Sequence, residues 1–187
     1  MTILYFIRHA KPDYSVKDDM IRPLLPVGLK KSKKLVKIFS EIKIDYIYSS
    51  PYKRSIQTIE PIAENKNIEI KIINDFREGK MDNKWIDNFY EFIETHWNDF
   101  SYKIINGESL IEVQKRNIKE LNKILLENKD ATIMIGTHGI ALSTIINYYD
   151  KTFQYEKFIE IIDMMPYIMK MEFNNNKYIR REEIKII

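Results

Sequence analysis

The chain has 187 residues, of which 44% are hydrophobic and 30% charged, enough apolar material for one domain with a full core. Its net charge of +3 is small and no dense run of like charges appears, so neither a nucleic acid nor a membrane is predicted as a partner. The absence of cysteine excludes disulfides, thiolate metal ligands and a cysteine nucleophile. Without a signal-like segment or an apolar stretch of about 20 residues, the length of a membrane span, a cytoplasmic protein is expected.

A short apolar run, Thr2–Ile7, opens the chain and ends abruptly in Arg8 and His9. Runs of this kind are typical of buried strands in a parallel sheet. Open α/β sheets hold their ligands at the carboxyl ends of such strands. We therefore expect Arg8 and His9 at a ligand-binding edge, with the polar segment over residues 11–23 as a loop at the same edge.

The next predicted element is an amphipathic helix from Pro26 to about Ser40. Its lysines, concentrated between positions 30 and 37, are expected on the solvated face. The apolar side chains expected to face the core are Leu29, Leu35, Val36 and Phe39.

A second strand, Asp45–Tyr48, leads into a helix whose start is marked by Ser50 and Pro51. Serine is a preferred N-cap and proline fits the first helical position, so Ser50 is predicted to cap a helix that runs to about residue 64. Arg54 would then lie in the first turn of this helix, near its positive end and the carboxyl end of the strand.

A third strand, Glu69–Ile73, is followed by a polar loop over residues 74–84. This loop also leaves the sheet at a strand end and carries several carboxylates. Glu78 is our candidate for an acid–base group, and Asp75 and Asp82 are the alternatives.

An aromatic-rich segment over residues 85–100 has helical spacing. We expect a small helical insertion, at about residues 80–106, packed over or beside the site. A capping box follows, because Ser109 precedes Glu112 by three positions. It predicts a long helix that ends near Asn128.

A second apolar run, Thr132–Ile135, is bounded by Gly136, Thr137, His138 and Gly139. If this run is also a parallel strand, His138 reaches the same sheet edge as His9. A helix is predicted from Gly139 to Tyr148. Two strand-like segments, Tyr167–Phe173 and Lys177–Arg181, flank three asparagines and indicate a hairpin at the sheet edge.

The alternation of strands and helices predicts an α/β fold. We expect a three-layer α/β/α arrangement, with a mostly parallel central sheet and a C-terminal edge hairpin, in a single domain that spans residues 1–187.

The side chains expected at this edge suit a phosphoryl group. Arg8 and Arg54 offer guanidinium forks that match phosphate oxygens, and Gly139 heads a helix whose free N–H groups favour an anion. A neutral His9 can attack phosphorus to give a phosphohistidine. A carboxylic acid with a raised pKa can then protonate the leaving alkoxide and later deprotonate water.

Five segments, taken in order, resemble the histidine phosphatase superfamily, also called phosphoglycerate mutase-like. They are Arg8-His9-Ala10, residues 49–58 (SSPYKRSIQT), Phe76-Arg77-Glu78-Gly79, Gly107-Glu108-Ser109 with Arg116, and Thr137-His138-Gly139. The resemblance implies that His9 is the phosphorylated nucleophile and that Glu78 is the proton donor. It also implies phosphate binding by Arg8, Arg54 and His138.

Three departures from the family pattern bear on function. Ala10 replaces the common glycine, Ser15 stands where the mutases carry a phosphate-contacting asparagine, and the insertion between Glu78 and Gly107 is shorter than in phosphoglycerate mutases. The shorter insertion favours a phosphatase with a more open pocket.

We therefore predict a phosphomonoester hydrolase, histidine acid phosphatase-like, that acts on a small phosphorylated molecule without a metal or other cofactor. A zinc site is not expected, because zinc usually takes three or four protein ligands and only two histidines converge. The alternatives are a phosphoglycerate mutase and a catalytically inactive phosphate-binding module.

Overall fold

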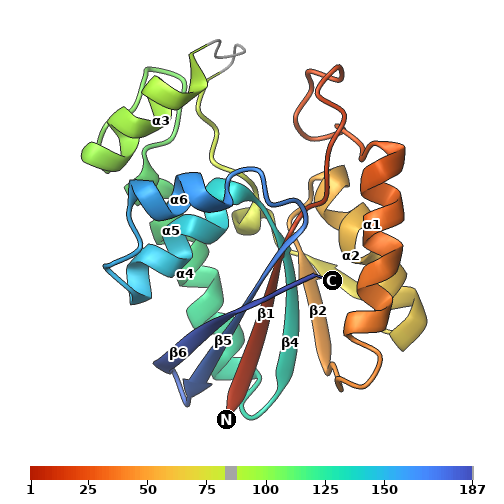
Figure 1. Cartoon of the computed structure of the whole chain (residues 1–187). Coiled ribbons are helices and arrows are strands. Elements are labelled where there is room, and N and C mark those ends of the chain that lie inside the picture. The colour runs from red at the N-terminus through yellow and green to blue at the C-terminus, as the bar shows by residue number, and fades with distance from the viewer. Residues whose placement is uncertain (83–87, 187) are drawn as a thin grey trace.

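The computed structural model of the protein describes residues 1–82 and 88–186. Within this part of the chain, six strands form one sheet in the order β3-β2-β4-β1-β5-β6 (Figure 1). Strands β1 to β4 run parallel to one another. Strand β5 is antiparallel to β1, and β6 is antiparallel to β5. The strands are β1 (Thr2–Arg8), β2 (Tyr46–Ser49), β3 (Ile70–Ile72), β4 (Thr132–Thr137), β5 (Tyr167–Asn174) and β6 (Lys177–Ile184). The predicted mostly parallel sheet with a C-terminal hairpin is confirmed.

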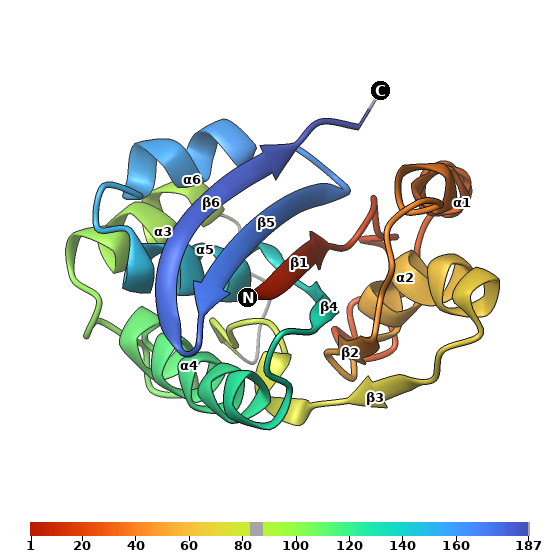
Figure 2. The same ribbon diagram turned by 90° about the horizontal axis from the view of Figure 1, so that it is seen from below.

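Helices cover both faces of the sheet, as the three-layer prediction requires (Figure 1, Figure 2). Helices α1 and α2 pack on one face, and α3 to α6 lie on the other. The helices are α1 (Pro26–Ile38), α2 (Lys53–Lys66), the 3₁₀ turn η1 (Asn74–Phe76), α3 (Phe89–Asn98), α4 (Leu110–Glu127), α5 (Gly139–Tyr149) and α6 (Tyr155–Ile161). In the part of the chain that the structure describes, no helix is both long and apolar enough to cross a bilayer.

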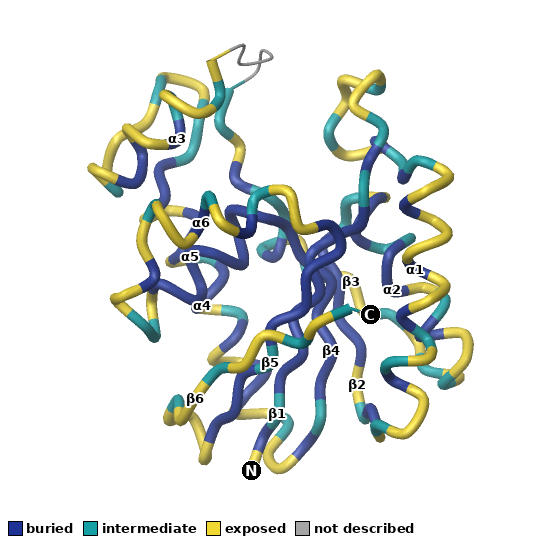
Figure 3. The backbone as a smooth tube through the Cα atoms, in the orientation of Figure 1, coloured by how far each residue is buried: buried dark blue, intermediate teal, exposed yellow. Residues whose placement is uncertain are grey.

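Strand β1 is buried on both faces, which explains its nearly unbroken apolar sequence. Leu4 and Phe6 belong to the core on the side of α4 and α5, whereas Tyr5 and Ile7 belong to the core on the side of α1 and α2. Figure 3 shows the same burial along most of the neighbouring strand β4. The two strands that end nearest the predicted site are therefore buried along most of their length.

The buried face of α1 differs from the prediction only at Leu29, because Leu35 and Phe39 are buried and Val36 packs against the core as predicted. Leu29 is 39% exposed, and Gly28 and Ser32 are buried in its place together with Leu35. A Cβ on Gly28 would stand 2.5 Å from the carbonyl oxygen of Lys11, so small residues allow the helix to approach the loop after β1. The loop after β1 therefore lies against the small residues of α1.

The start of α2 is also later than predicted. Tyr52, not Ser50, is the N-cap, and the helix begins at Lys53. The Ser50 hydroxyl accepts a hydrogen bond from the Tyr52 amide at 3.2 Å and lies 2.7 Å from Nε2 of His138. The capping rule assigned the Ser50 side chain to the start of α2, but this side chain contacts His138, which is distant in the sequence.

The remaining elements match the predictions in part. Ser109 and Glu112 form the expected capping box at the start of α4. Helix α3 occupies the middle of the predicted insertion, although residues 83–87, including Trp85, lie outside the described residues. Helix α6 was not predicted, because its seven residues are too few to show a helical period.

Candidate active site

Parallel pairing of β1 with β4 brings the two predicted histidines together. Arg8 is in register with Thr137, and the His9 amide donates to the Thr137 carbonyl oxygen at 3.1 Å. The ring centroids of His9 and His138 are 5.3 Å apart. Both rings are buried at the carboxyl ends of the strands, where the sequence predicted a ligand site.

The surroundings of His9 hold its ring neutral and in one tautomer. Nδ1 lies 2.8 Å from the carbonyl oxygen of Ala10, which can only accept, so Nδ1 carries the proton of the neutral ring. Burial, followed by the nearby charges of Arg54 and Arg8, holds the pKa of His9 well below 6.5. The ring is therefore neutral near pH 7, with the lone pair of Nε2 unprotonated.

Arg8 and Gly139 lie in contact at the start of α5. Nη1 of Arg8 donates to the carbonyl oxygen of Ile161 at 2.8 Å, which fixes the guanidinium from the end of α6. A Cβ on Gly139 would stand 3.2 Å from Cζ and Nη2 of Arg8. Glycine at this helix start thus allows the guanidinium to lie against the backbone.

Three buried polar atoms without a hydrogen-bond partner belong to residues at the carboxyl ends of β1 and β4. They are Nε of Arg8, Oγ1 of Thr137 and Nδ1 of His138; the other unpartnered buried atoms of the described residues belong to His96, Trp97, Asn117, Ser143 and Tyr149. Buried polar atoms nearly always have a hydrogen-bond partner in folded proteins. Unpartnered polar atoms that lie at one site therefore indicate a polar ligand. All three can donate a hydrogen bond, which is the requirement for binding an anion.

Ser50 contacts the ring of His138. The Ser50 hydroxyl accepts from the Tyr52 amide and can donate its own proton to Nε2 of His138. In the tautomer that accepts this proton at Nε2, Nδ1 carries the ring proton and is a donor. Burial, with the charge of Arg54 next in importance, keeps the pKa of His138 well below 6.5.

Arg54 lies in the first turn of α2, as predicted, and is 3% exposed. Its Nη1 donates to the backbone oxygen of Asp19 at 2.6 Å and lies 3.1 Å from the Asp19 carboxylate. Asp19 also pairs with Arg22. Sequence reasoning missed Asp19, because the loop after β1 also contains Asp13 and Asp18 and no local pattern distinguishes the three.

Glu78 lies at the N-terminus of α5. One carboxylate oxygen accepts from the amides of Gly79 and Ala141, each at 2.9 Å, and the other accepts from the Ile140 amide at 3.2 Å. Burial nevertheless outweighs these bonds and raises the pKa of Glu78 above 4.5. Of the two alternatives, Asp82 also lines the site cavity, whereas the Asp75 carboxylate pairs with Arg77.

A cavity of about 750 Å³ opens over these residues. Its lining includes His9, Arg8, Arg54, Glu78 and Gly139, together with apolar and charged side chains from the loop after β1, from α3 and from α6. Ser15 is not among the lining residues; it is exposed, and its hydroxyl donates to Asp13 at 2.7 Å. His138 is not among the lining residues either, but its ring lies 5.3 Å from that of His9, so the structure brings together all the predicted site residues except Ser15.

The sequence matches the model of the "Histidine phosphatase superfamily (branch 1)" over residues 4–177. The chain belongs to this superfamily. The ordered motifs that suggested the resemblance all lie within the matched range.

Curated relatives include two kinds of enzyme. "Putative phosphoserine phosphatase 2" of Hydrogenobacter thermophilus is 26% identical over 161 residues, which cover 78% of this chain and 77% of the relative. "Probable phosphoglycerate mutase GpmB" of Proteus mirabilis is 24% identical over 160 residues, covering 79% and 74%.

Solved structures share the fold. Phosphoserine phosphatase from Entamoeba histolytica, in complex with 3-phosphoglyceric acid, superposes with a TM-score of 0.81 at 20% identity and covers 100% of this chain and 98% of its own. Bacillus stearothermophilus YhfR gives a TM-score of 0.78 at 22% identity, covering 95% and 94%. At these identities the likeness shows the fold alone.

Proposed function

We propose that this protein is a phosphatase that hydrolyses small phosphomonoesters through a phosphohistidine on His9. One observation carries the proposal: an imidazole held neutral, with Nε2 unprotonated, lies among two buried arginines and several unpartnered donors. A dianionic phosphoryl group satisfies those donors and presents phosphorus to the ring.

The first half of the reaction phosphorylates the ring. The Nε2 lone pair forms a bond to phosphorus as the bond to the ester oxygen breaks. Arg8 and Arg54 neutralise charge on the remaining phosphoryl oxygens, and the neutral ring of His138 donates a hydrogen bond to them. The departing alkoxide takes a proton from the Glu78 carboxyl group, whose pKa is raised by burial. The products are phosphohistidine, an alcohol and the Glu78 carboxylate.

The second half returns the enzyme to its starting state. The Glu78 carboxylate removes a proton from a water molecule as its oxygen attacks phosphorus, and Nε2 of His9 departs with its electron pair. Inorganic phosphate is released and Glu78 is again protonated. Neither half requires a metal ion or an organic cofactor.

The cavity lining supports an alcohol that carries both charged and apolar groups. The lining includes the charged residues Lys11, Lys80 and Asp163 and the aromatic residues Tyr14 and Phe158. Such walls accept small metabolites that bear a carboxylate or an amine as well as aryl phosphates. The named ligands of the solved relatives, phosphoserine and 3-phosphoglyceric acid, belong to the first group.

A screen for released phosphate tests the proposal. Purified protein is incubated with phosphoserine, 3-phosphoglycerate, sugar phosphates, nucleotides and 4-nitrophenyl phosphate, with and without a chelator. Turnover that survives the chelator and disappears in His9→Ala is expected. Retained turnover in His9→Ala would refute the mechanism.

A mutase is the second candidate, because one relative bears that name. In a mutase the phosphoenzyme transfers its phosphoryl group to a bound alcohol rather than to water. An assay of 3-phosphoglycerate with a bisphosphoglycerate primer separates the two: release of inorganic phosphate supports the phosphatase, and interconversion of the phosphoglycerates supports the mutase.

A further inference from the structure

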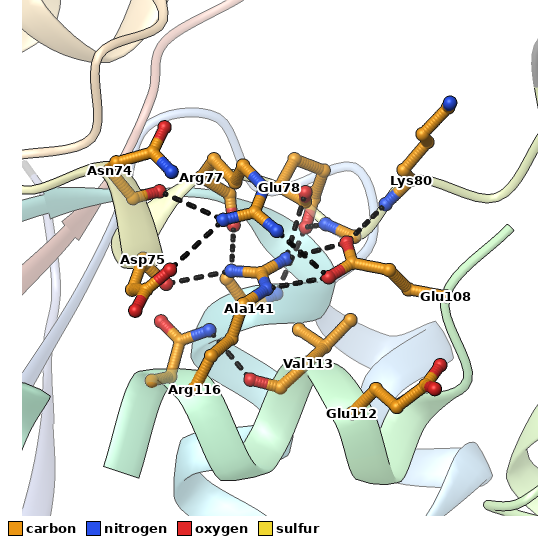
Figure 4. Close-up of polar contacts among 12 residues, drawn as sticks. Asn74, Asp75, Arg77, Glu78, Lys80, Glu108, Glu112, Val113, Arg116 and Ala141 are labelled. Carbon is orange, nitrogen blue, oxygen red and sulfur yellow. Dashed lines mark hydrogen bonds and ion pairs between the residues drawn. The ribbon is translucent and has the colours of Figure 1, made fainter. Parts of the chain in front are cut away.

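Arg116 of α4 binds the backbone that carries Glu78 (Figure 4). Its Nη1 donates to the carbonyl oxygens of Asp75 at 2.7 Å and Arg77 at 2.8 Å, and its Nη2 donates to the carbonyl oxygen of Glu78 itself at 3.1 Å. The guanidinium therefore binds three main-chain carbonyl oxygens of the segment that ends at Glu78.

Glu108 binds both Arg116 and the backbone that follows Glu78. Its two carboxylate oxygens accept from Nε and Nη2 of Arg116 at 2.8 and 2.9 Å. The same carboxylate accepts from the Lys80 amide at 3.0 Å and from Arg77 at 3.1 Å. Although burial opposes it, hydrogen bonding from Arg116 lowers the pKa of Glu108, so the group is an anion near pH 7.

A close backbone contact between residues 107–108 and residues 80–81 adds to these hydrogen bonds. The Glu108 amide donates to the carbonyl oxygen of Lys80 at 2.6 Å. A Cβ on Gly107 would stand only 2.2 Å from the carbonyl oxygen of Met81, so the two segments touch at this point. The chain is thus fixed on both sides of Glu78 by residues 107, 108 and 116.

Arginine is specifically required by this geometry. The guanidinium has five N–H donors, and the five hydrogen bonds to Asp75, Arg77, Glu78 and Glu108 occupy all of them. Lysine has three donors on a single nitrogen and cannot reach the same acceptors. The Glu78 segment belongs to no strand or long helix, and its carboxylate is also held by the amides of Gly79, Ile140 and Ala141.

We propose that Arg116 and Glu108 form a positioning pair that holds the Glu78 carboxyl group where it can protonate the leaving oxygen. This inference rests on the proposed function. Neither residue lines the cavity, and both hydrogen-bond to the segment that carries Glu78, so we expect each to act on the reaction through Glu78.

The leaving group of the substrate distinguishes positioning from mere stability. An alkoxide needs a proton to depart, whereas 4-nitrophenolate is stable enough to leave without one. Loss of a well-placed acid therefore lowers kcat/KM for alkyl phosphates far more than for 4-nitrophenyl phosphate. A general loss of folded protein lowers both values equally.

The test compares Arg116→Ala and Glu78→Gln on 4-nitrophenyl phosphate and on the alkyl phosphate that the native protein hydrolyses fastest. Both variants are expected to lower kcat/KM for the alkyl phosphate about 100-fold and for the aryl phosphate about tenfold or less. Because Arg116 acts through Glu78, the double variant should be no slower than Glu78→Gln alone. Lys115→Ala, an exposed neighbour on α4, is the matched control and should change neither value.

Equal losses on the two substrates, or additive losses in the double variant, would overturn the positioning role while leaving the proposed function intact. Failure of the native protein to hydrolyse either ester would instead remove the proposed function, and the inference with it. If Arg116→Ala does not fold, Glu108→Gln keeps the side-chain shape, removes the charge and decides by the same comparison.

Discussion

The imidazole rings of His9 and His138 lie 5.3 Å apart because each residue directly follows one of two adjacent parallel strands. Arg8 and Thr137 are the last paired residues, so the next residue of each strand enters the same space above the sheet. The sheet register thus builds the site, and side chains from the loops and from α2 complete it. Each of the following predictions changes one part of that arrangement.

The pH dependence of kcat/KM should show two limbs with defined directions. As pH falls through the lowered pKa of His9, the ring gains a proton and loses its nucleophilic lone pair, so the acid limb lies below pH 6.5. As pH rises through the raised pKa of Glu78, the acid is lost and kcat/KM for an alkyl phosphate falls. Initial rates, corrected for the ionisation of the substrate, measure both limbs. Glu78→Gln should abolish the alkaline limb; an acid limb above pH 6.5 would show that His9 is not held neutral.

Gly139→Ala should weaken phosphate binding without weakening the fold. The added Cβ would stand 3.2 Å from the Arg8 guanidinium, which is held at Ile161 and must shift by a few tenths of an ångström. We expect the inhibition constant of inorganic phosphate to rise about tenfold, equivalent to about 1.4 kcal/mol. Alanine is the better helix former, so the Tm should not fall. A lowered Tm with unchanged phosphate affinity would mean that the added Cβ disturbs the fold and not the Arg8 guanidinium.

Asp19→Asn should tighten phosphate binding. The Asp19 carboxylate lies 3.1 Å from Arg54 and repels an incoming dianion, while the backbone contact with Arg54 survives the substitution. The gain is about 1 kcal/mol for charges separated by a few ångströms in a solvated site, or about fivefold in the inhibition constant of phosphate. Asp13→Asn, in the same loop but not lining the cavity, is the control. Weaker binding in Asp19→Asn would mean that the carboxylate mainly holds Arg54 in place.

Ser50→Ala should disturb the tautomer of His138. Without the hydroxyl at 2.7 Å, Nε2 has no donor to keep it unprotonated, and Nδ1 loses its fixed role as a phosphate donor. A hydrogen bond to a charged group is worth about 1.5–3 kcal/mol, so phosphate affinity should fall at least about tenfold. Nitrogen NMR of labelled histidine reports the tautomer directly. An unchanged His138 spectrum would show that Ser50 does not set the tautomer of His138.

Much of the site could be predicted because strand ends are local features. The runs before His9 and His138 are apolar and short, and each is followed at once by polar residues. Parallel pairing of such strands leaves little freedom in where those residues lie. The fold class and the candidate positions of Arg54 and Glu78 followed from the same reasoning.

What could not be predicted depends on contacts between distant segments. Arg8 is held by Ile161, 153 residues away, at the end of a helix too short to recognise. Ser50 was assigned to a helix cap because the sequence does not show that His138 reaches it. Ser15 has the spacing of a phosphate contact, but it turns toward Asp13 outside the cavity lining.

The most direct test of the account is the phosphorylation of His9. Glu78→Gln is mixed with 4-nitrophenyl phosphate and quenched in alkali, because phosphohistidine is labile in acid and the variant lacks the base that activates water. Mass spectrometry of the digested chain should find one phosphoryl group, on the peptide that contains His9, and none in the Glu78→Gln variant that also carries His9→Ala. Undiminished turnover by His9→Ala in the native background, with no phosphoryl group on residue 9, would contradict the account.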